Sequence, residues 1–109
     1  MSNKENFQLV ICTCPDKTSA SSIAENIVAQ RLAACVNILP GIQSIYKWQG
    51  NVESAQEYLM LIKSHRDKFS ALQNSIVSMH PYEVPEIIAL DINQGFPEYL
   101  NWLGSSILS

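Results

Sequence analysis

Two segments of this chain are apolar at every position, and this pattern restricts the folds open to it. They are 58–62, Tyr-Leu-Met-Leu-Ile, and 87–90, Ile-Ile-Ala-Leu. Successive residues of a strand point to opposite faces, so a sheet with one wet face alternates apolar and polar residues. These segments predict instead a sheet that is apolar on both faces. A fold for this chain must therefore cover both sides of its sheet.

The remaining elements expected from the sequence cover only one of those sides. Runs of β-branched and apolar residues predict strands, and apolar residues at helical spacing predict helices. The expected elements are a strand at 7–14, a helix at 17–34, strands at 36–48 and 52–63, a helix capped by Asp67, a strand at 86–92 and a short helix from Pro97. This order predicts an α+β, ferredoxin-like β-α-β-β-α-β antiparallel sheet with an extra C-terminal helix. Both main helices then lie on one face.

The second and third expected strands read as one long hairpin. Gln49-Gly50-Asn51 supplies a turn between them. Pro40-Gly41 interrupts the second strand. Proline cannot donate to a strand ladder and glycine tolerates unusual backbone angles, so we expect a bulge there.

The second sheet face needs cover from another source. Several hundred Å² of exposed apolar sheet is an unusually large patch for a monomer. Only 16% of the residues are charged, against about 25% in typical domains, which also indicates that some surface meets another chain. We expect this face to pack against copies of the same chain. The alternative is that the C-terminal helix folds over it.

Length, charge and hydropathy exclude several classes of function. The 109 residues suit a single domain spanning 1–109. The seven basic residues are scattered through a chain of net charge −3, which argues against a nucleic-acid footprint. The apolar runs are too short to span a bilayer and residues 1–6 are polar, so a cytoplasmic location is expected. The odd set of cysteines, Cys12, Cys14 and Cys35, predicts reduced thiols.

Six motifs along the chain are informative when taken together. They are Cys12-Thr13-Cys14-Pro15-Asp16, Leu32 to Ile38, Ser44-Ile45-Tyr46-Lys47-Trp48-Gln49-Gly50, Leu61-Ile62-Lys63, the loop His80-Pro81-Tyr82-Glu83-Val84-Pro85-Glu86-Ile87, and Tyr99-Leu100-Asn101-Trp102 following Gly95. Together they resemble the CutA-like divalent-cation-tolerance proteins. The resemblance runs in order from about residue 8 to 106. It implies a ferredoxin-like fold and a compact homotrimer similar in architecture to the PII signalling proteins. It also implies a non-enzymatic role in the response to metal ions, with copper binding in some members.

The resemblance further implies a set of metal ligands. The family pattern places copper on a first-strand cysteine and a His-His pair, which correspond here to Cys12, Met79 and His80. Met79 replaces the first histidine, so the predicted donor set for copper or another divalent ion is softer than the family pattern. The structural alternative is a buried Cys12, a core Met79 and a His80 that hydrogen-bonds a nearby carbonyl at a helix end. Cys12 and Cys14 also form a Cys-x-Cys pair, which without further ligands is weak evidence for a site.

Two other functions remain open from the residues. In a PII-like sensor, Lys47, Lys63 and Arg66 could bind a small anionic effector in a cleft between subunits. In a Cys-dependent enzyme, Cys12 or Cys35 would pair with His65 or His80, which requires hydrogen-bond reach and a lowered thiol pKa. The sequence places no third orienting residue beside such a pair, so we expect no catalytic residues.

Overall fold

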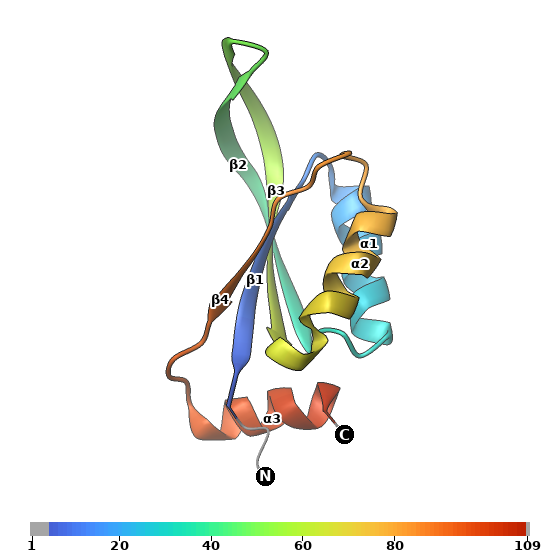
Figure 1. The fold of residues 1–109 in the computed structure, drawn as a ribbon, viewed down its shortest axis with the longest axis vertical. Coiled ribbons are helices and arrows are strands. Elements are labelled where there is room, and N and C mark those ends of the chain that lie inside the picture. The colour runs from blue at the N-terminus through green and yellow to red at the C-terminus, as the bar shows by residue number, and fades with distance from the viewer. Residues whose placement is uncertain (1–4, 109) are drawn as a thin grey trace.

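The computed structural model describes residues 5–108, which form four strands and three α-helices (Figure 1). In chain order these are β1 (Phe7–Cys14), α1 (Lys17–Ala29), β2 (Cys35–Trp48), β3 (Asn51–His65), α2 (Phe69–Met79), β4 (Ile87–Asp91) and α3 (Pro97–Ile107). A short 3-10 turn, η1 (Arg66–Lys68), precedes α2. The predicted order of strands and helices is therefore confirmed within this part of the chain.

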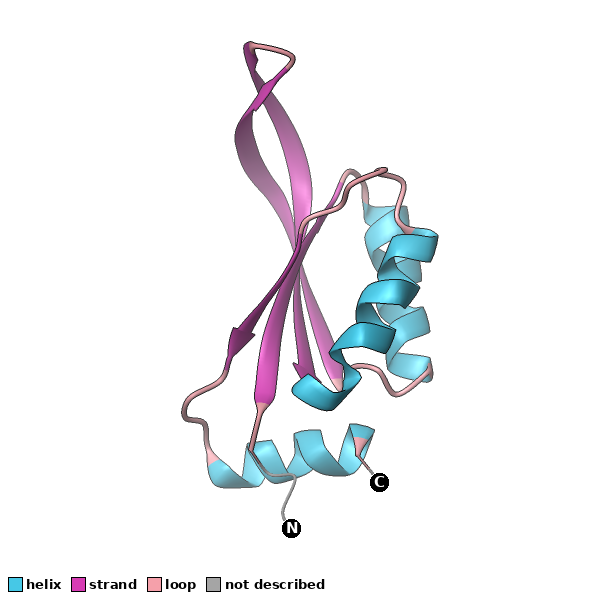
Figure 2. Cartoon of the chain, in the orientation of Figure 1, coloured by secondary structure: helices cyan, strands magenta, loops and turns pink. Residues whose placement is uncertain are grey.

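The strands form one antiparallel sheet, and α1 and α2 pack against one of its faces (Figure 2). The strand order is β2-β3-β1-β4, so β1 and β3 are central. Their inward side chains and those of the two helices make the core: Val10, Cys12, Cys14, Met60, Ile62, Ile23, Ile27, Leu72 and Ile76. Full burial of one large apolar side chain stabilises the fold by about 1.5–3 kcal/mol. This layer therefore holds the two central strands in a fixed register.

The β2–β3 hairpin projects well beyond the helices (Figure 1), and its bulge lies where it was predicted. Between Leu39 and Ile42 the register shifts, because three steps along β2 match two steps along β3. Gly41 within this shift has a left-handed φ of 73°, which glycine adopts without steric penalty. The bulge places one extra residue in β2 and bends the hairpin.

The turn at the end of the hairpin is also the predicted one. Trp48 pairs with Asn51, which leaves Gln49 and Gly50 as the two central residues. Their φ values are 50° and 81°. Positive φ at both central residues characterises the type I′ turn, whose twist matches that of the flanking strands.

Helix α1 ends earlier than predicted, at Ala29 rather than Ala34. Arg31 adopts a left-handed φ of 61°, and the backbone N–H groups of Leu32 and Ala33 donate back to the carbonyl of Ile27 at 2.9 and 3.3 Å. The resulting turn brings Leu32 and Ala33 into the core. Burial of these side chains outweighs the helical periodicity that predicted a longer helix.

The prediction that Asp67 caps the second helix is wrong. β3 continues to His65, two residues beyond its expected end, so Asp67 lies within η1 and the N-cap of α2 is Lys68. The backbone N–H of Asp67 donates to Nδ1 of His65 at 3.0 Å. His65 thus performs at η1 the capping role that the sequence assigned to Asp67.

The second face of the sheet remains largely uncovered by this chain. Its apolar residues include Leu9, Ile11, Leu39, Leu59, Leu61, Ile88 and Leu90. Ile88 is 49% exposed and Leu90 is 48% exposed. Helix α3 crosses only one end of the sheet (Figure 1), where Gly104 lies against the ring of Phe7. The C-terminal helix therefore does not supply the missing cover.

Candidate functional site

Thiol, thioether and imidazole groups converge where β1 and α2 both end. Cys12 and Cys14 occupy alternate positions of β1, so both thiols point into the core layer. The antiparallel register places Met60 of β3 directly opposite Cys12. His80 follows the last residue of α2. The Sγ atoms of both cysteines and one ring nitrogen of His80 all lie within 4.8 Å of one another.

The closest contacts of this group centre on Cys14. Its thiol donates to Sδ of Met60 at 3.5 Å, and its Sγ lies 3.7 Å from Nε2 of His80. Cys12, Cys14 and Met60 are each 0% exposed, and His80 is 8% exposed. We call Cys12, Cys14 and Met60 the sulfur cluster. The cluster is inaccessible to solvent, and His80 lies beside it.

Both ring nitrogens of His80 are bonded to the backbone. The backbone N–H of Tyr82 donates to Nδ1 at 3.0 Å, which leaves the ring proton of neutral His80 on Nε2. Nε2 lies 2.8 Å from the carbonyl oxygen of Thr13 and donates to it. This is the structural role that the sequence analysis offered as the alternative for His80. The hydrogen bond between His80 and Thr13 joins the end of α2 to the end of β1.

The two thiols of the cluster influence each other's ionisation in opposite directions. The hydrogen bond between them and burial raise the pKa of Cys12 well above its ordinary value. The same hydrogen bond, offered by Cys12, lowers the pKa of Cys14, although burial opposes this effect. Of the two thiols, Cys14 is therefore the one that loses its proton more readily.

Tyr82 and Glu57 form a hydrogen-bonded pair next to His80. Tyr82 donates its hydroxyl proton to Oε2 of Glu57 at 2.6 Å, and the rings of His80 and Tyr82 have centroids 4.9 Å apart. Glu57 is 8% exposed, so its carboxylate depends on this hydrogen bond. Burial and the hydrogen bond to Glu57 raise the pKa of Tyr82 above its ordinary value.

Two of the three metal ligands expected from the family pattern come together. The ligand atoms of Cys12 and His80 lie within 4.8 Å of each other, while Met79 packs against the hydrophobic core as a half-buried side chain. Cys14 and Met60 were missed as ligand candidates. The Cys-x-Cys spacing was a signal for Cys14. Met60 could not be found from spacing, because its contact with Cys14 joins residues that are 46 apart in sequence.

Both histidines proposed as partners for a catalytic cysteine use their two ring nitrogens in hydrogen bonds to backbone groups. Nε2 of His65 lies 2.7 Å from the Glu5 carbonyl, and Nδ1 accepts the Asp67 N–H. Cys35 lies on the second sheet face, where Nζ of Lys63 is 3.9 Å from its Sγ. Cys12, beside His80, is fully buried. Neither His65 nor His80 therefore offers a free base to an accessible thiol.

The basic residues proposed for an anion site do not converge. Lys47 pairs with Val52 near the hairpin tip, whereas Lys63 pairs with Leu9. Eleven strand steps separate Val52 from Lys63 on β3, roughly 36 Å at the usual rise per residue. Lys63 donates to the side-chain oxygen of Asn37. A single chain thus holds these two cations far apart.

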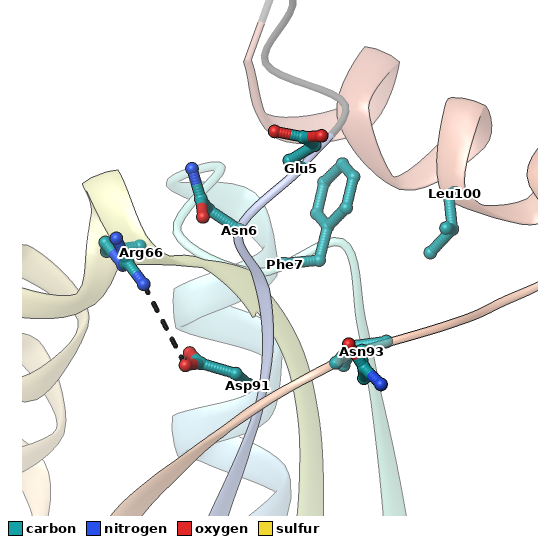
Figure 3. A pocket seen from close by; sticks show the side chains of 8 residues that line it. Glu5, Asn6, Phe7, Arg66, Asp91, Asn93 and Leu100 are labelled. Carbon is teal, nitrogen blue, oxygen red and sulfur yellow. Dashed lines mark ion pairs between the residues drawn. The ribbon is translucent and has the colours of Figure 1, made fainter.

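Arg66, the third of these cations, borders a surface hollow of about 420 Å³ at the other end of the sheet (Figure 3). The hollow is lined by Glu5, Asn6, Phe7, Arg66, Asp91, Ile92, Asn93 and Leu100. Arg66 lies 3.8 Å from the carboxylate of Asp91, and both side chains are mostly exposed. An exposed pair of this kind is worth at most about 1 kcal/mol. The positive charge of Arg66 is balanced by Asp91, so the hollow offers no strong anion site.

The sequence profile of a known family matches most of the chain. Residues 8–106 match the family described as "CutA1 divalent ion tolerance protein". The chain belongs to this family. It is 49% identical over 96 residues to the divalent-cation tolerance protein CutA of Thermus thermophilus, a match that covers 88% of this chain and 93% of that protein. It is 50% identical over 95 residues to the CutA homolog of Xenopus laevis, covering 87% of this chain and 63% of that longer protein.

Solved structures of CutA1 proteins share the fold. The CutA1 structure from Shewanella sp. SIB1 superposes with a TM-score of 0.92 at 40% identity, covering 96% of this chain and 98% of that one. None of the helices within residues 5–108 is long and apolar enough to cross a membrane.

The donor groups at the end of β1 are of kinds that bind metal ions. Ligand atoms within 4.8 Å of one another can surround one ion, since metal–sulfur bonds are about 2.3 Å long. Thiolate and thioether sulfurs favour soft ions such as Cu(I), whereas imidazole also suits Cu(II) and Zn(II). Cys12, Cys14 and Met60 supply the soft donors. A bound ion would neutralise the charge of a deprotonated thiol in this buried position.

Proposed function

We propose that this chain works in metal-ion tolerance as a metal-binding homotrimer in the cytoplasm, without catalytic activity. The observation that carries the proposal is the convergence of Cys12, Cys14 and His80 within 4.8 Å in a buried position of a CutA1 family member. Buried thiols beside an imidazole are a combination that transition-metal ions bind. The full sequence, 1–109, then acts as a single domain, and the strand order β2-β3-β1-β4 supports a ferredoxin-like arrangement.

The expected ion is copper or a similar divalent metal. The ligands expected from the family pattern are Cys12, Met79 and His80, and Cys14 lies beside two of them. Recruiting His80 requires that Nε2 exchange its hydrogen bond to Thr13 for the ion. Cys12 requires no such exchange with the backbone of another element. The thiols are therefore the stronger part of the proposed site.

Self-association is supported by the second face of the sheet. Ile88 and Leu90 of its edge strand β4 are apolar and half exposed, and α3 crosses only one end of the sheet. Covering apolar area is worth roughly 25 cal/mol per Å², which gives association a driving force. The projecting hairpin adds further exposed apolar side chains, including Ile45, Trp48 and Val52, which are 68%, 61% and 73% exposed. A second copy of the chain is the expected cover.

The experiment that tests this function combines mass and metal binding. Light scattering after size exclusion should give about 37 kDa, three times the 12.2 kDa chain. Titration with Cu(II), Zn(II) and, under anaerobic conditions, Cu(I) should show one ion per chain, with affinity lost in Cys12→Ala. Cys35→Ser is the matched control, because Cys35 lies on the other sheet face. A mass of one chain would refute the proposed trimer. If none of these ions binds, the proposed metal role is refuted.

A further inference from the structure

We propose that the sulfur cluster of Cys12, Cys14 and Met60 is a three-sulfur site for a soft monovalent cation, Cu(I) or Ag(I), with His80 outside the coordination shell. This inference rests on the proposed metal role and specifies its donor atoms and the charge of its ion. It differs from the ligand set that the family pattern predicts, which includes Met79 and His80.

The positions of the three sulfurs fit a single ion. A planar three-coordinate ion with bonds of about 2.3 Å holds its sulfur ligands about 4 Å apart. Sγ of Cys14 and Sδ of Met60 are 3.5 Å apart, and the two cysteine Sγ atoms lie within 4.8 Å. Met60 is the direct cross-strand partner of Cys12, and such side chains have Cβ atoms about 4.5–5.5 Å apart. The three side chains therefore lie close enough for one ion to bridge them.

A proton now occupies the position that the cation would take. The Cys14 thiol points its hydrogen at Sδ of Met60. Binding exchanges this proton and that of Cys12 for the cation: both S–H bonds break, two thiolate–metal bonds form, and both protons leave to solvent. The thioether of Met60 then donates a lone pair to the ion instead of accepting a hydrogen bond. No oxidation or reduction takes place.

His80 is excluded as a ligand by its own hydrogen bonds. Nδ1 accepts from the Tyr82 backbone, and Nε2 donates to the Thr13 carbonyl. Coordination through Nε2 would move the ring proton to Nδ1, where it would oppose the Tyr82 N–H. Nε2 also lies 3.7 Å from Sγ of Cys14. His80 therefore orients and stabilises the thiolate as an outer partner.

The all-sulfur donor set selects for a soft ion. Thiolate and thioether sulfurs favour Cu(I), whereas Zn(II) is almost always four-coordinate and the cluster offers three sulfurs. All three sulfur residues are 0% exposed, so solvent has no access to supply a fourth ligand. The cluster should thus prefer Cu(I) or Ag(I) over Zn(II).

The test measures Cu(I) affinity of the full chain, anaerobically, by competition with a Cu(I)-selective chelator such as bathocuproine disulfonate. Several hours of equilibration allow for buried sulfurs. Cys14→Ala should weaken Cu(I) binding at least about 100-fold, and Met60→Leu, which conserves volume, at least about 10-fold. Cys35→Ser should leave it unchanged. Wild-type affinity in both cluster variants would overturn the site.

X-ray absorption of the copper-loaded wild type decides the question independently of any variant. Three sulfur neighbours without an imidazole nitrogen support the site, whereas a nitrogen neighbour overturns it. Binding that requires Met79 or His80 as a ligand, but neither Cys14 nor Met60, keeps the proposed function and overturns this inference. Zn(II) binding as tight as Cu(I) binding overturns the selectivity for a soft ion. If no ion binds at all, the proposed metal role fails as well.

Discussion

The hydroxyl of Tyr82 donates a 2.6 Å hydrogen bond to the carboxylate of Glu57, and so connects the loop after α2 to β3. Glu57 is 8% exposed. The ring of Tyr82 also contacts that of His80 at a tilted angle of 47°, and His80 in turn is hydrogen-bonded to the carbonyl of Thr13 at the end of β1. The three strand and loop segments around the sulfur cluster are therefore held by one chain of polar contacts.

Removing the Tyr82 hydroxyl should destabilise the protein. Tyr82→Phe leaves the buried Glu57 carboxylate without its donor, which costs about 1–3 kcal/mol in free energy of unfolding. Guanidinium unfolding at one fixed chain concentration measures this loss. Glu57→Gln is the control, since its amide oxygen still accepts from Tyr82, and a loss below about 1 kcal/mol is expected. Equal losses in the two variants would contradict this account.

The same pair predicts a loss of stability at high pH. Burial and the hydrogen bond to Glu57 raise the pKa of Tyr82 in the folded state, whereas in the unfolded chain it is about 10. The contribution is thus complete below about pH 10 and declines as pH rises above it, because only the unfolded chain releases the proton. The free energy of unfolding, measured between about pH 8 and pH 11, should fall more steeply with rising pH for wild type than for Tyr82→Phe. Parallel curves would refute the coupling.

The two buried histidines should contribute similarly to stability but differently to metal binding. Each accepts one backbone N–H and donates to one backbone carbonyl. His65→Ala and His80→Ala should each cost about 2–4 kcal/mol, measured by denaturant unfolding. Only His80 lies beside Cys14, so only His80→Ala should weaken copper affinity, about 10–100-fold. An equal effect of His65→Ala on copper affinity would attribute the change to lost stability.

A charge on the second sheet face should dissociate the oligomer. Ile88 of β4 and Val77 of α2 are both 49% exposed in the single chain, which makes them a matched pair. Ile88→Glu buries a carboxylate between subunits, a strongly unfavourable change, and should reduce the mass measured by light scattering to that of one chain. Val77→Glu, on the outer face of α2, should leave the mass unchanged. Dissociation by Val77→Glu alone would place the contact on the helices.

A single substitution in the hairpin turn should stabilise the protein. Gln49 has a φ of 50°, a left-handed value that asparagine tolerates better than glutamine. Gln49→Asn creates the Asn-Gly pair preferred in type I′ turns and should add about 0.5–1 kcal/mol to the free energy of unfolding. Gly50→Ala, at a φ of 81°, should instead destabilise it. A destabilised Gln49→Asn would show that the glutamine makes a contact that the turn needs.

The sequence alone predicted those features that depend on short stretches of chain. Strand β1, the Pro40-Gly41 bulge, the Gln49-Gly50 turn and the proline start of α3 lie where they were expected. Each follows from the backbone angles that its own residues allow. The two-sided apolar strands were equally visible, because side-chain direction alternates along any strand.

Only the tertiary structure decided where distant residues meet. Helix α1 ends at Ala29, and not at the predicted Ala34, because burying Leu32 and Ala33 in the core is more favourable than continuing the helix. Cys14 contacts Met60 and His80, which are 46 and 66 residues away. Those contacts depend on the register of β1 against β3 and on the path of the loop after α2. Register is a property of the whole sheet, set by packing on both strands at once, and no local pattern around either sulfur encodes it.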